Sequence, residues 1–148
     1  MRLVIIEQSM IEDLVKKSCH IDTVHIDKNY ENDFLPELLS VYNDLNNNLL
    51  FYDIKMKKTR NILTKYYSNK ITKVELDYLG YTEKCCVNLD KKEIDLAIEV
   101  NEFYIQVRVD YELTKNNIKN IETVISKYKF RYQDIKNLIE YNKMVGNQ

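Results

Sequence analysis

Residues 93–110, EIDLAIEVNEFYIQVRVD, alternate between apolar and polar side chains along most of their length. Alternation with period two places the apolar residues on one face of a β-strand and the polar residues on the other. With Asn101 and Glu102 as a turn, the pattern predicts an antiparallel hairpin of two strands. In that register Asp95 faces Arg108 across the polar face, where we expect the two side chains to form an ion pair.

The same period extends toward the N-terminus from this hairpin. Residues 71–79 and 81–89 also alternate, and Gly80 between them is typical of a short connection. We therefore expect an antiparallel meander of three or four strands over about 71–111, covered on one face by flanking helices. The predicted fold class is α+β. A chain of this length is expected to form a single domain, which spans residues 1–148.

The segments on either side of the predicted sheet have the apolar spacing of helices. Ser9 and Glu12 match a capping box at the start of the first helix, and Thr114 matches an N-cap of a later one. The three asparagines at 46–48 are expected to break or bend a helix. The expected helices cover residues 9–17, 35–45 after Asp33 as N-cap, 51–67, 115–128 and 132–143, with further short strands at 3–6 and 21–27.

Composition is that of a globular protein, with 45% hydrophobic and 30% charged residues. Uncharged apolar runs are no longer than five residues, which is too short to span a membrane, and the early Glu7 argues against a signal peptide. Three cysteines without a signal peptide predict reduced thiols that act as packing residues, so we expect a cytoplasmic protein. Abundant Asn, Lys and Ile indicate an AT-rich genome, such as that of a low-GC bacterium, its phage or a large DNA virus.

Charge is distributed in blocks, although the net charge is only −1. Residues 1–48 and 71–114 each carry a net charge of −5, whereas residues 49–70 and 115–148 carry +5 and +4. Two interpretations remain open. Neighbouring blocks neutralise one another, or the molecule has a sizeable dipole that steers a charged partner.

Residues 19–27, CHIDTVHID, contain every common type of metal ligand. On a strand, His20 and Asp22 face one side while His25 and Asp27 face the other. Zinc needs ligands that converge on one point. We therefore expect a solvent-exposed strand face here rather than a metal site. We expect no cofactor elsewhere in the chain.

The basic residues of segment 51–70 are interleaved with Tyr52, Tyr66 and Tyr67. Clustered cations contact phosphates, and aromatic rings stack on the bases of single strands. On a helix, however, these residues spread around the circumference, which is also the pattern of a solvated helix face. Nucleic acid binding through this basic helix therefore stays open as an alternative.

An acid on one strand followed by a [Glu/Gln]-x-[Lys/Arg] motif on the next resembles the PD-(D/E)XK nuclease-like fold. Here the acid is Asp95 and the motif is Gln106-Val107-Arg108, in a run that resembles the nuclease-like domain at the C-terminus of some prokaryotic ATPases. The resemblance implies a Mg²⁺-dependent nuclease module, active or degenerate. In it Asp95 holds the metal, Gln106 takes the second ligand position, and Arg108 takes the position of the lysine that orients water. Glutamine is a poorer ligand for hard cations than a carboxylate, and arginine cannot act as a base.

The chain has no glycine-rich phosphate loop, no Gly-x-Ser-x-Gly motif and no His-Glu-x-x-His motif. This favours a non-enzymatic protein that docks on a macromolecule, such as an inhibitor, an immunity-type protein or an assembly factor. The nuclease module and a structural subunit of a larger assembly are the alternatives. We expect a protein partner, because tyrosine-rich surfaces suit interfaces, and no membrane partner. The expected binding residues are the basic Lys57, Lys58 and Arg60 and the acidic Glu75, Asp77 and Glu83.

Overall fold

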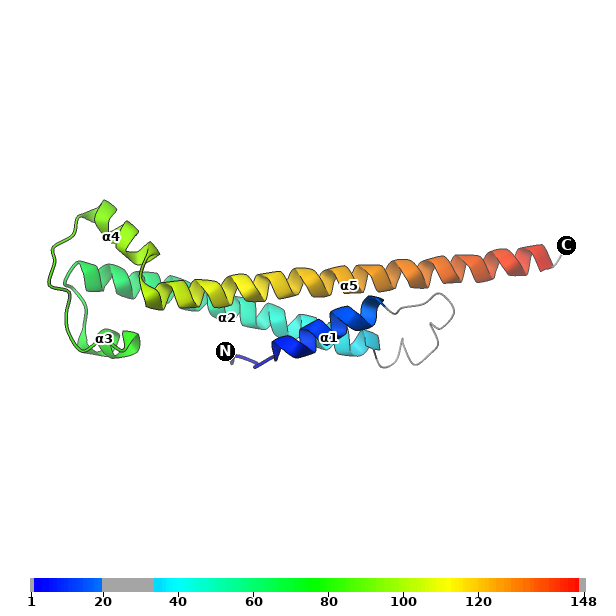
Figure 1. The fold of residues 1–148 in the computed structure, drawn as a ribbon, viewed down its shortest axis with the longest axis horizontal. Coiled ribbons are helices and arrows are strands. Elements are labelled where there is room, and N and C mark those ends of the chain that lie inside the picture. The colour runs from blue at the N-terminus through cyan, green and yellow to red at the C-terminus, as the bar shows by residue number, and fades with distance from the viewer. Residues whose placement is uncertain (1, 20–33, 147–148) are drawn as a thin grey trace. The chain divides into compact units, whose positions relative to one another are not determined.

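The computed structural model describes residues 2–19 and 34–146. Within these two ranges every regular element is a helix (Figure 1). The predicted α+β class and the antiparallel meander over 71–111 are therefore wrong. In chain order the helices are α1 (Gln8–Cys19), α2 (Leu35–Tyr67), α3 (Lys73–Leu79), α4 (Lys91–Glu99) and α5 (Glu102–Gly146).

The segment expected to form the hairpin forms α4 and the start of α5 instead. A spacing of four residues fits both a strand of period two and a helix of period 3.6, so Ile94 and Ile98 belong to both patterns. These two side chains are buried in α4. Leu96 and Val100, which the alternation also assigned to the core, are 69% and 73% exposed.

Capping boxes explain why α3 and α4 begin where they do. The Thr72 hydroxyl accepts the backbone N–H of Glu75, and the Glu75 carboxylate accepts the N–H of Thr72 at 3.1 Å. Asp90 and Glu93 form the same reciprocal pair of hydrogen bonds before α4. Each box satisfies two amide groups that a helix N-terminus would otherwise leave without a partner.

Gly80 ends α3 rather than turning a hairpin. Its φ of 73° is left-handed, and its N–H reaches the carbonyl groups of the last turn of α3. The strand expected at 81–89 is absent, since this segment has no regular structure. It carries the free thiols of Cys85, which is half-buried, and Cys86, which is exposed and so does not act as the expected packing residue.

Two expected helix boundaries do not occur. The asparagines at 46–48 lie inside α2, where the buried side-chain amide of Asn48 bonds the C=O and N–H of Val4 at 2.7 and 2.9 Å. The short strand expected at 3–6 is absent. The backbone groups of Val4 bond the Asn48 side chain instead of a neighbouring strand. Thr114 is buried within α5, whose first turn is capped by Asn101.

The expected helix at 9–17 is confirmed as α1, which begins one residue before Ser9 and buries Ile11 and Leu14. The Ser9 hydroxyl lies 3.5 Å from the Glu7 carboxylate. The strand expected at 21–27 and the ligand-type side chains around it lie outside the described residues, namely His20, Asp22, His25, Asp27 and the expected N-cap Asp33.

The chain divides into two compact units. Unit 1 is formed by Leu49–Leu113, which includes the second part of α2, all of α3 and α4, and the start of α5. Unit 2 is formed by Arg2–Asn48 and Thr114–Gln148, and its described part includes α1, the start of α2 and the rest of α5.

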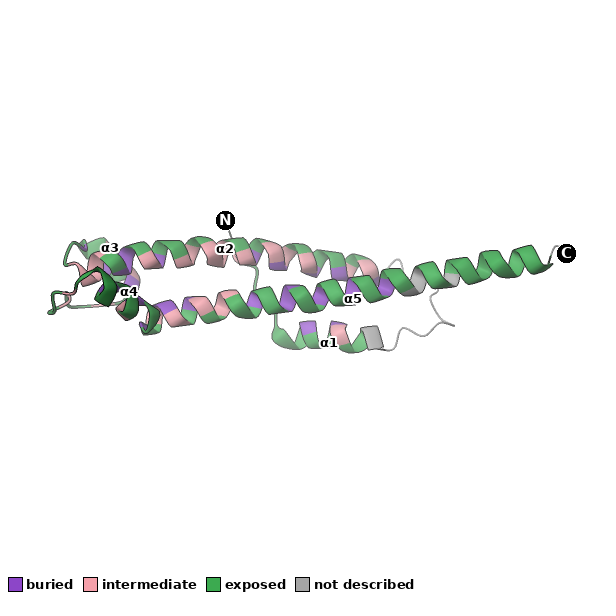
Figure 2. Cartoon of the chain, turned by 90° about the horizontal axis from the view of Figure 1, so that it is seen from above, coloured by how far each residue is buried: buried purple, intermediate pink, exposed green. Residues whose placement is uncertain are grey.

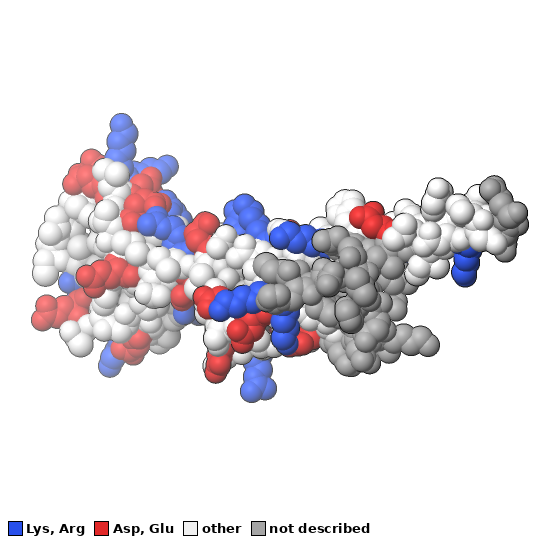
Figure 3. Space-filling view, turned by 45° about the vertical axis from the view of Figure 1, so that its right-hand side comes forward, with Lys and Arg blue, Asp and Glu red and all other residues white. Residues whose placement is uncertain are grey.

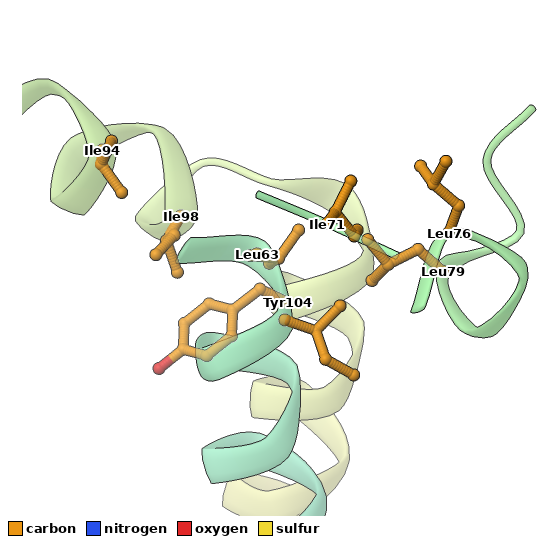
Figure 4. Packing of buried hydrophobic residues seen from close by; sticks show 8 residues of the cluster. Leu63, Ile71, Leu76, Leu79, Ile94, Ile98 and Tyr104 are labelled. Atoms are coloured by element: carbon orange, nitrogen blue, oxygen red, sulfur yellow. The ribbon is translucent and has the colours of Figure 1, made fainter. Parts of the chain in front are cut away.

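The core of unit 1 draws side chains from four helices (Figure 4). Tyrosines contribute rings to the packing and hydroxyls to hydrogen bonds, and the rings of Tyr66 and Tyr81 lie 5.0 Å apart. The buried cluster consists of Ile62, Leu63, Ile71, Leu76, Leu79, Ile94, Ile98 and Tyr104.

In unit 2, helices α1, α2 and α5 each bury one face. Polar pairs join these helices: the side-chain amides of Gln8 and Asn117 bond each other at 3.2 and 3.0 Å, and the Tyr42 hydroxyl donates to Glu122 at 3.0 Å. The buried apolar residues include Ile11, Leu14, Leu38, Val41, Leu45, Ile118, Ile121, Val124, Ile125 and Tyr128.

None of the helices in the described ranges has a stretch that is both long enough and apolar enough to cross a membrane.

Candidate functional site

The three basic residues expected to bind a partner lie in α2, within unit 1. Lys57 forms an ion pair with Asp53 at 3.0 Å. The ammonium group of Lys58 lies 4.5 Å from the centre of the Tyr78 ring. Arg60 belongs to a charge cluster that includes residues of α4 and α5. Each of the three therefore already has a contact inside the chain.

The three acidic residues of the expected set differ in their surroundings. The Glu75 carboxylate pairs with Lys65 at 3.0 Å, and hydrogen bonds from Lys65 and from Thr72 hold the pKa of Glu75 below its ordinary value. Asp77 and Glu83 are exposed. In the described part of the chain, no ion pair joins a basic member of the expected set to an acidic one.

Two residues of the nuclease-like motif, Asp95 and Arg108, lie in one charge cluster but do not pair with each other, and Gln106 bonds elsewhere. The Asp95 carboxylate lies 3.7 Å from the Arg60 guanidinium. The side-chain amide of Gln106 donates a hydrogen bond to the Asp110 carboxylate, one turn later in α5, at 3.2 Å. Arg108 pairs with Glu99 at 2.8 Å. The Asp95–Arg108 pair expected across a hairpin is absent, because two helices replace the hairpin.

A cluster of charged side chains joins α2, α4 and α5 in unit 1. One oxygen of the Glu99 carboxylate accepts from Arg60 at 3.0 Å, and the other accepts from Arg108 at 2.8 Å. Both guanidinium groups lie 5.8 Å from the centre of the Tyr104 ring. Hydrogen bonds to Glu99 and to the Tyr104 hydroxyl raise the pKa of Arg60. We call this set the Glu99 cluster: Arg60, Asp95, Glu99, Tyr104 and Arg108.

The Glu99 cluster holds helices together rather than presenting free charge. Its ion-paired side chains are between 38% and 59% exposed, so each pair contributes modestly to stability. Its two arginines are balanced by two carboxylates, those of Asp95 and Glu99, so the cluster carries no net charge. Among the residues that the structure describes, no group of three or more His, Cys, Asp or Glu side chains is placed to hold a metal ion.

The C-terminal end of α5 differs in burial from the rest of that helix (Figure 2). From Tyr104 to Tyr128, α5 buries a residue at nearly every turn. After Tyr128, every side chain that the structure describes is exposed. Beyond Tyr128, none of the side chains that the structure describes belongs to a packed face of α5.

Six large apolar side chains lie exposed in this end of α5, and all are between 51% and 73% exposed. In the view of Figure 3, the surface of this end of α5 is mostly uncharged. At 3.6 residues per turn, five of the six fall within about a third of the helix circumference. We call these five the C-terminal stripe: Phe130, Leu138, Tyr141, Met144 and Val145.

The C-terminal stripe does not continue the buried face of α5. Ile121, Val124 and Tyr128 mark the side of α5 that is buried in unit 2. Helical periodicity places the stripe on roughly the opposite side, whereas Ile139, the sixth exposed apolar residue, follows the buried side. The stripe is therefore a second apolar surface on the same helix.

Sequence reasoning missed both features. It placed Glu99 and Tyr104 on strands, where they faced each other rather than Arg60. It found a helix at 132–143 from Leu138 and Ile139 but did not separate the two faces on which these residues lie. Plotting the apolar residues of 129–146 around a helix would have revealed the stripe, because the signal is present in the spacing alone.

Comparisons with protein-family models, with curated proteins and with solved structures find no match to this chain.

Proposed function

We propose that this chain is a docking protein whose C-terminal stripe binds a protein partner. The observation that carries the proposal is the contrast within α5. This helix buries one face as far as Tyr128 and then exposes a second apolar face over residues 129–146.

Residues 129–146 extend a helix that is already formed in α5, but most helical stability in proteins comes from packing an apolar face. Each large apolar side chain that is fully buried contributes roughly 1.5–3 kcal/mol. Because the five side chains of the stripe are 51–73% exposed, burying what remains of them yields roughly 5–9 kcal/mol, which lies within the range of the cost of association, about 4–15 kcal/mol.

The stripe suits a groove in another protein. Leu138, Tyr141 and Val145 are spaced as i, i+3 and i+7, which is the anchor pattern of a helix that lies in an apolar groove. Tyr141 is also of a residue type that often carries binding energy at interfaces.

Charge favours a partner with an acidic rim. Residues 129–146 contain four basic and two acidic residues. An acidic rim around the groove complements this segment, whereas a second copy of the chain brings together two segments of the same sign. An inhibitor, an immunity-type protein, an assembly factor and a structural subunit would all use the stripe in this way, and the identity of the partner distinguishes them.

Site-specific photocrosslinking tests the proposal on the full chain. One form carries p-benzoylphenylalanine in place of Tyr141. The matched control carries it in place of Lys143, which is two residues away on another side of the helix and is also exposed. In an extract of the cells in which the protein functions, we expect a defined protein to crosslink at position 141 and not at position 143.

Variants and hydrogen exchange complete the test. Changing Leu138, Tyr141 and Met144 to Gln together should abolish binding of the captured protein, whereas Glu140→Gln with Asn142→Gln should not weaken it. The amides of residues 129–146 should exchange more slowly in the purified complex than in the chain alone. Equal crosslinking at both positions, crosslinks to a second copy only, or unchanged exchange would each contradict the proposal.

A further inference from the structure

Unit 1 contains a pocket at α2 and α3 that is separate from the C-terminal stripe. Its volume is about 330 Å³. Four lining residues come from α2 at spacings i, i+3, i+4 and i+7, which places them on one face of the helix, and the fifth comes from α3. The lining residues are Phe51, Ile54, Lys55, Lys58 and Tyr78.

The α3 wall of this pocket is held in place by three contacts. The Tyr78 hydroxyl lies 3.3 Å from the hydroxyl of Thr59, which is fully buried. The Tyr78 ring lies 5.5 Å from the ring of Phe103. The Lys58 ammonium group lies 4.5 Å from the centre of the Tyr78 ring. A wall that is ordered before binding lowers the entropy cost of taking up a ligand.

The two lysines of the pocket differ from their neighbour on α2. Lys57 is paired with Asp53. Neither Lys55 nor Lys58 lies in an ion pair with any residue that the structure describes. An ammonium group has three donors, so Lys58 can keep its contact with the Tyr78 ring and still bind an anion.

We propose that this pocket binds a small amphipathic carboxylate. The hydrocarbon part of the ligand lies against Phe51, Ile54 and Tyr78. Its carboxylate pairs with the ammonium groups of Lys55 and Lys58. Small-ligand pockets typically have volumes of about 300–1,000 Å³ and apolar walls with a few placed polar groups, and this pocket matches the smaller end of that range.

The inference does not rest on the proposed docking function, because no residue of the C-terminal stripe lines the pocket. A peptide with a phenylalanine beside a glutamate offers related chemistry from a protein source. The small volume of the pocket favours the free carboxylate, and the experiment distinguishes the two.

The probes are octanoate, 1-octanol and butyrate, titrated calorimetrically into the full chain at low ionic strength. Octanoate should bind, and affinity should rise about fourfold for each methylene added between butyrate and octanoate until the cavity is filled. Octanol has the same chain without the charge, and it should bind roughly tenfold more weakly than octanoate, since hydrogen bonds to charged groups are the stronger ones.

Variants assign the binding to this pocket. Lys55→Met with Lys58→Met should reduce octanoate affinity to that of octanol or below, because the carboxylate loses both ammonium partners, and should lower octanol affinity much less. The matched control Lys57→Met removes a charge from the same turn of α2 without altering the pocket, and it should leave octanoate affinity within about twofold of the wild-type value. Ile54→Gln, at a partly exposed position, should weaken both ligands.

Several results would overturn the proposal. These are the absence of octanoate binding, affinity that does not depend on chain length, equal affinity for octanol, or an equal loss in the Lys57→Met control. Binding of a Glu-Phe peptide by a chain that does not bind octanoate would make the pocket a protein-docking site and would equally refute the small carboxylate. Circular dichroism of each variant verifies that its helices are retained.

Discussion

One buried side chain, Asn101, organises the junction between α4 and α5. Its carbonyl oxygen accepts the backbone N–H groups of Phe103 and Tyr104 at 2.9 and 3.2 Å. Its amide nitrogen donates to the hydroxyls of Tyr67 and Tyr81 at 3.0 and 2.9 Å. The same residue therefore caps α5 and satisfies two tyrosines that come from elsewhere in unit 1.

We expect Asn101→Ala to lower the free energy of unfolding by about 2.5–4 kcal/mol, as measured by urea denaturation. Loss of an N-cap costs about 0.5–2 kcal/mol, and each lost hydrogen bond to a tyrosine hydroxyl adds roughly 1 kcal/mol. Asn101→Asp keeps the capping oxygen and should cost less. Asn116→Ala, at an exposed position in α5, should change stability by less than 1 kcal/mol. Equal effects of Asn101→Ala and Asn116→Ala would refute this account.

Asp95 allows a direct test of the nuclease resemblance. Its carboxylate faces the Arg60 guanidinium at 3.7 Å, and Gln106 is bonded within α5. We therefore predict no Mg²⁺- or Mn²⁺-dependent cleavage of plasmid DNA or RNA, and none after Gln106→Glu with Arg108→Lys. If the wild-type chain nicks DNA, and Asp95→Ala abolishes this cleavage without lowering the melting temperature, then the nuclease hypothesis is correct and this prediction is wrong.

At the scale of elements, the long helices follow from where proline and glycine occur. The single proline, Pro36, lies in the first turn of α2, where a missing N–H has no cost. The rest of α2, and α5 before Gly146, contain neither residue. Asparagine in a helix interior costs at most about 0.7 kcal/mol relative to alanine, which burial of neighbouring apolar residues outweighs.

The capping box of α3 should make stability depend on pH. Hydrogen bonds from Lys65 and Thr72 lower the pKa of Glu75 in the folded chain. A carboxyl whose pKa is lower when folded contributes stability above its unfolded pKa, and that contribution is lost as the pH falls through the folded value. The capping bonds from Glu93 lower the pKa of Asp90 in the same way.

We expect Glu75→Gln to destabilise the chain most near neutral pH. The difference from wild type should shrink as the pH falls below about 4, where the unfolded glutamate is itself protonated. Thermal unfolding measured across this range gives the result. The exposed Glu83→Gln serves as the control and should show no such trend. A difference that stays constant from pH 7 to pH 3 would mean that the charge of Glu75 has no part in the cap.

For the whole molecule, residues 130–148 should be dispensable for folding. No described side chain in that range is buried. A chain that ends at Lys129 should keep its free energy of unfolding within about 1 kcal/mol of the full chain and lose its protein partner. A chain that ends at Asn120 also loses the buried Ile121, Val124 and Tyr128, and it should be destabilised by several kcal/mol.

Denaturant unfolding of the two truncated chains separates these effects. If ending the chain at Lys129 lowers stability by more than about 2 kcal/mol, then the C-terminal stripe packs within the chain, and the proposed docking surface is wrong.

Apolar spacing was sufficient to predict helix at 9–17, 35–45, 51–67 and 115–128, although not the true boundaries of α2 and α5. The apolar residues of these segments recur at three and four residues and fit no strand, so the local pattern had one solution. It also carried the capping boxes of α3 and α4, Thr72 with Glu75 and Asp90 with Glu93, although the alternation of the same segments pointed to strands. Of the charged members of the Glu99 cluster, Arg60, Asp95 and Arg108 were candidates, whereas Glu99 and the pairing itself were not predicted.

The helices between 71 and 111 depend on contacts with segments that are distant in the chain. Ile94 and Ile98 fit a strand and a helix equally, because a spacing of four residues satisfies both periods. The choice depends on which partners these side chains meet, and they meet residues of α2, α3 and α5 in the core of unit 1. Likewise Glu99 binds two arginines that lie 39 and 9 residues away in the chain. The spacing of residues within one segment does not reveal such contacts, because they form only when packing brings distant segments together.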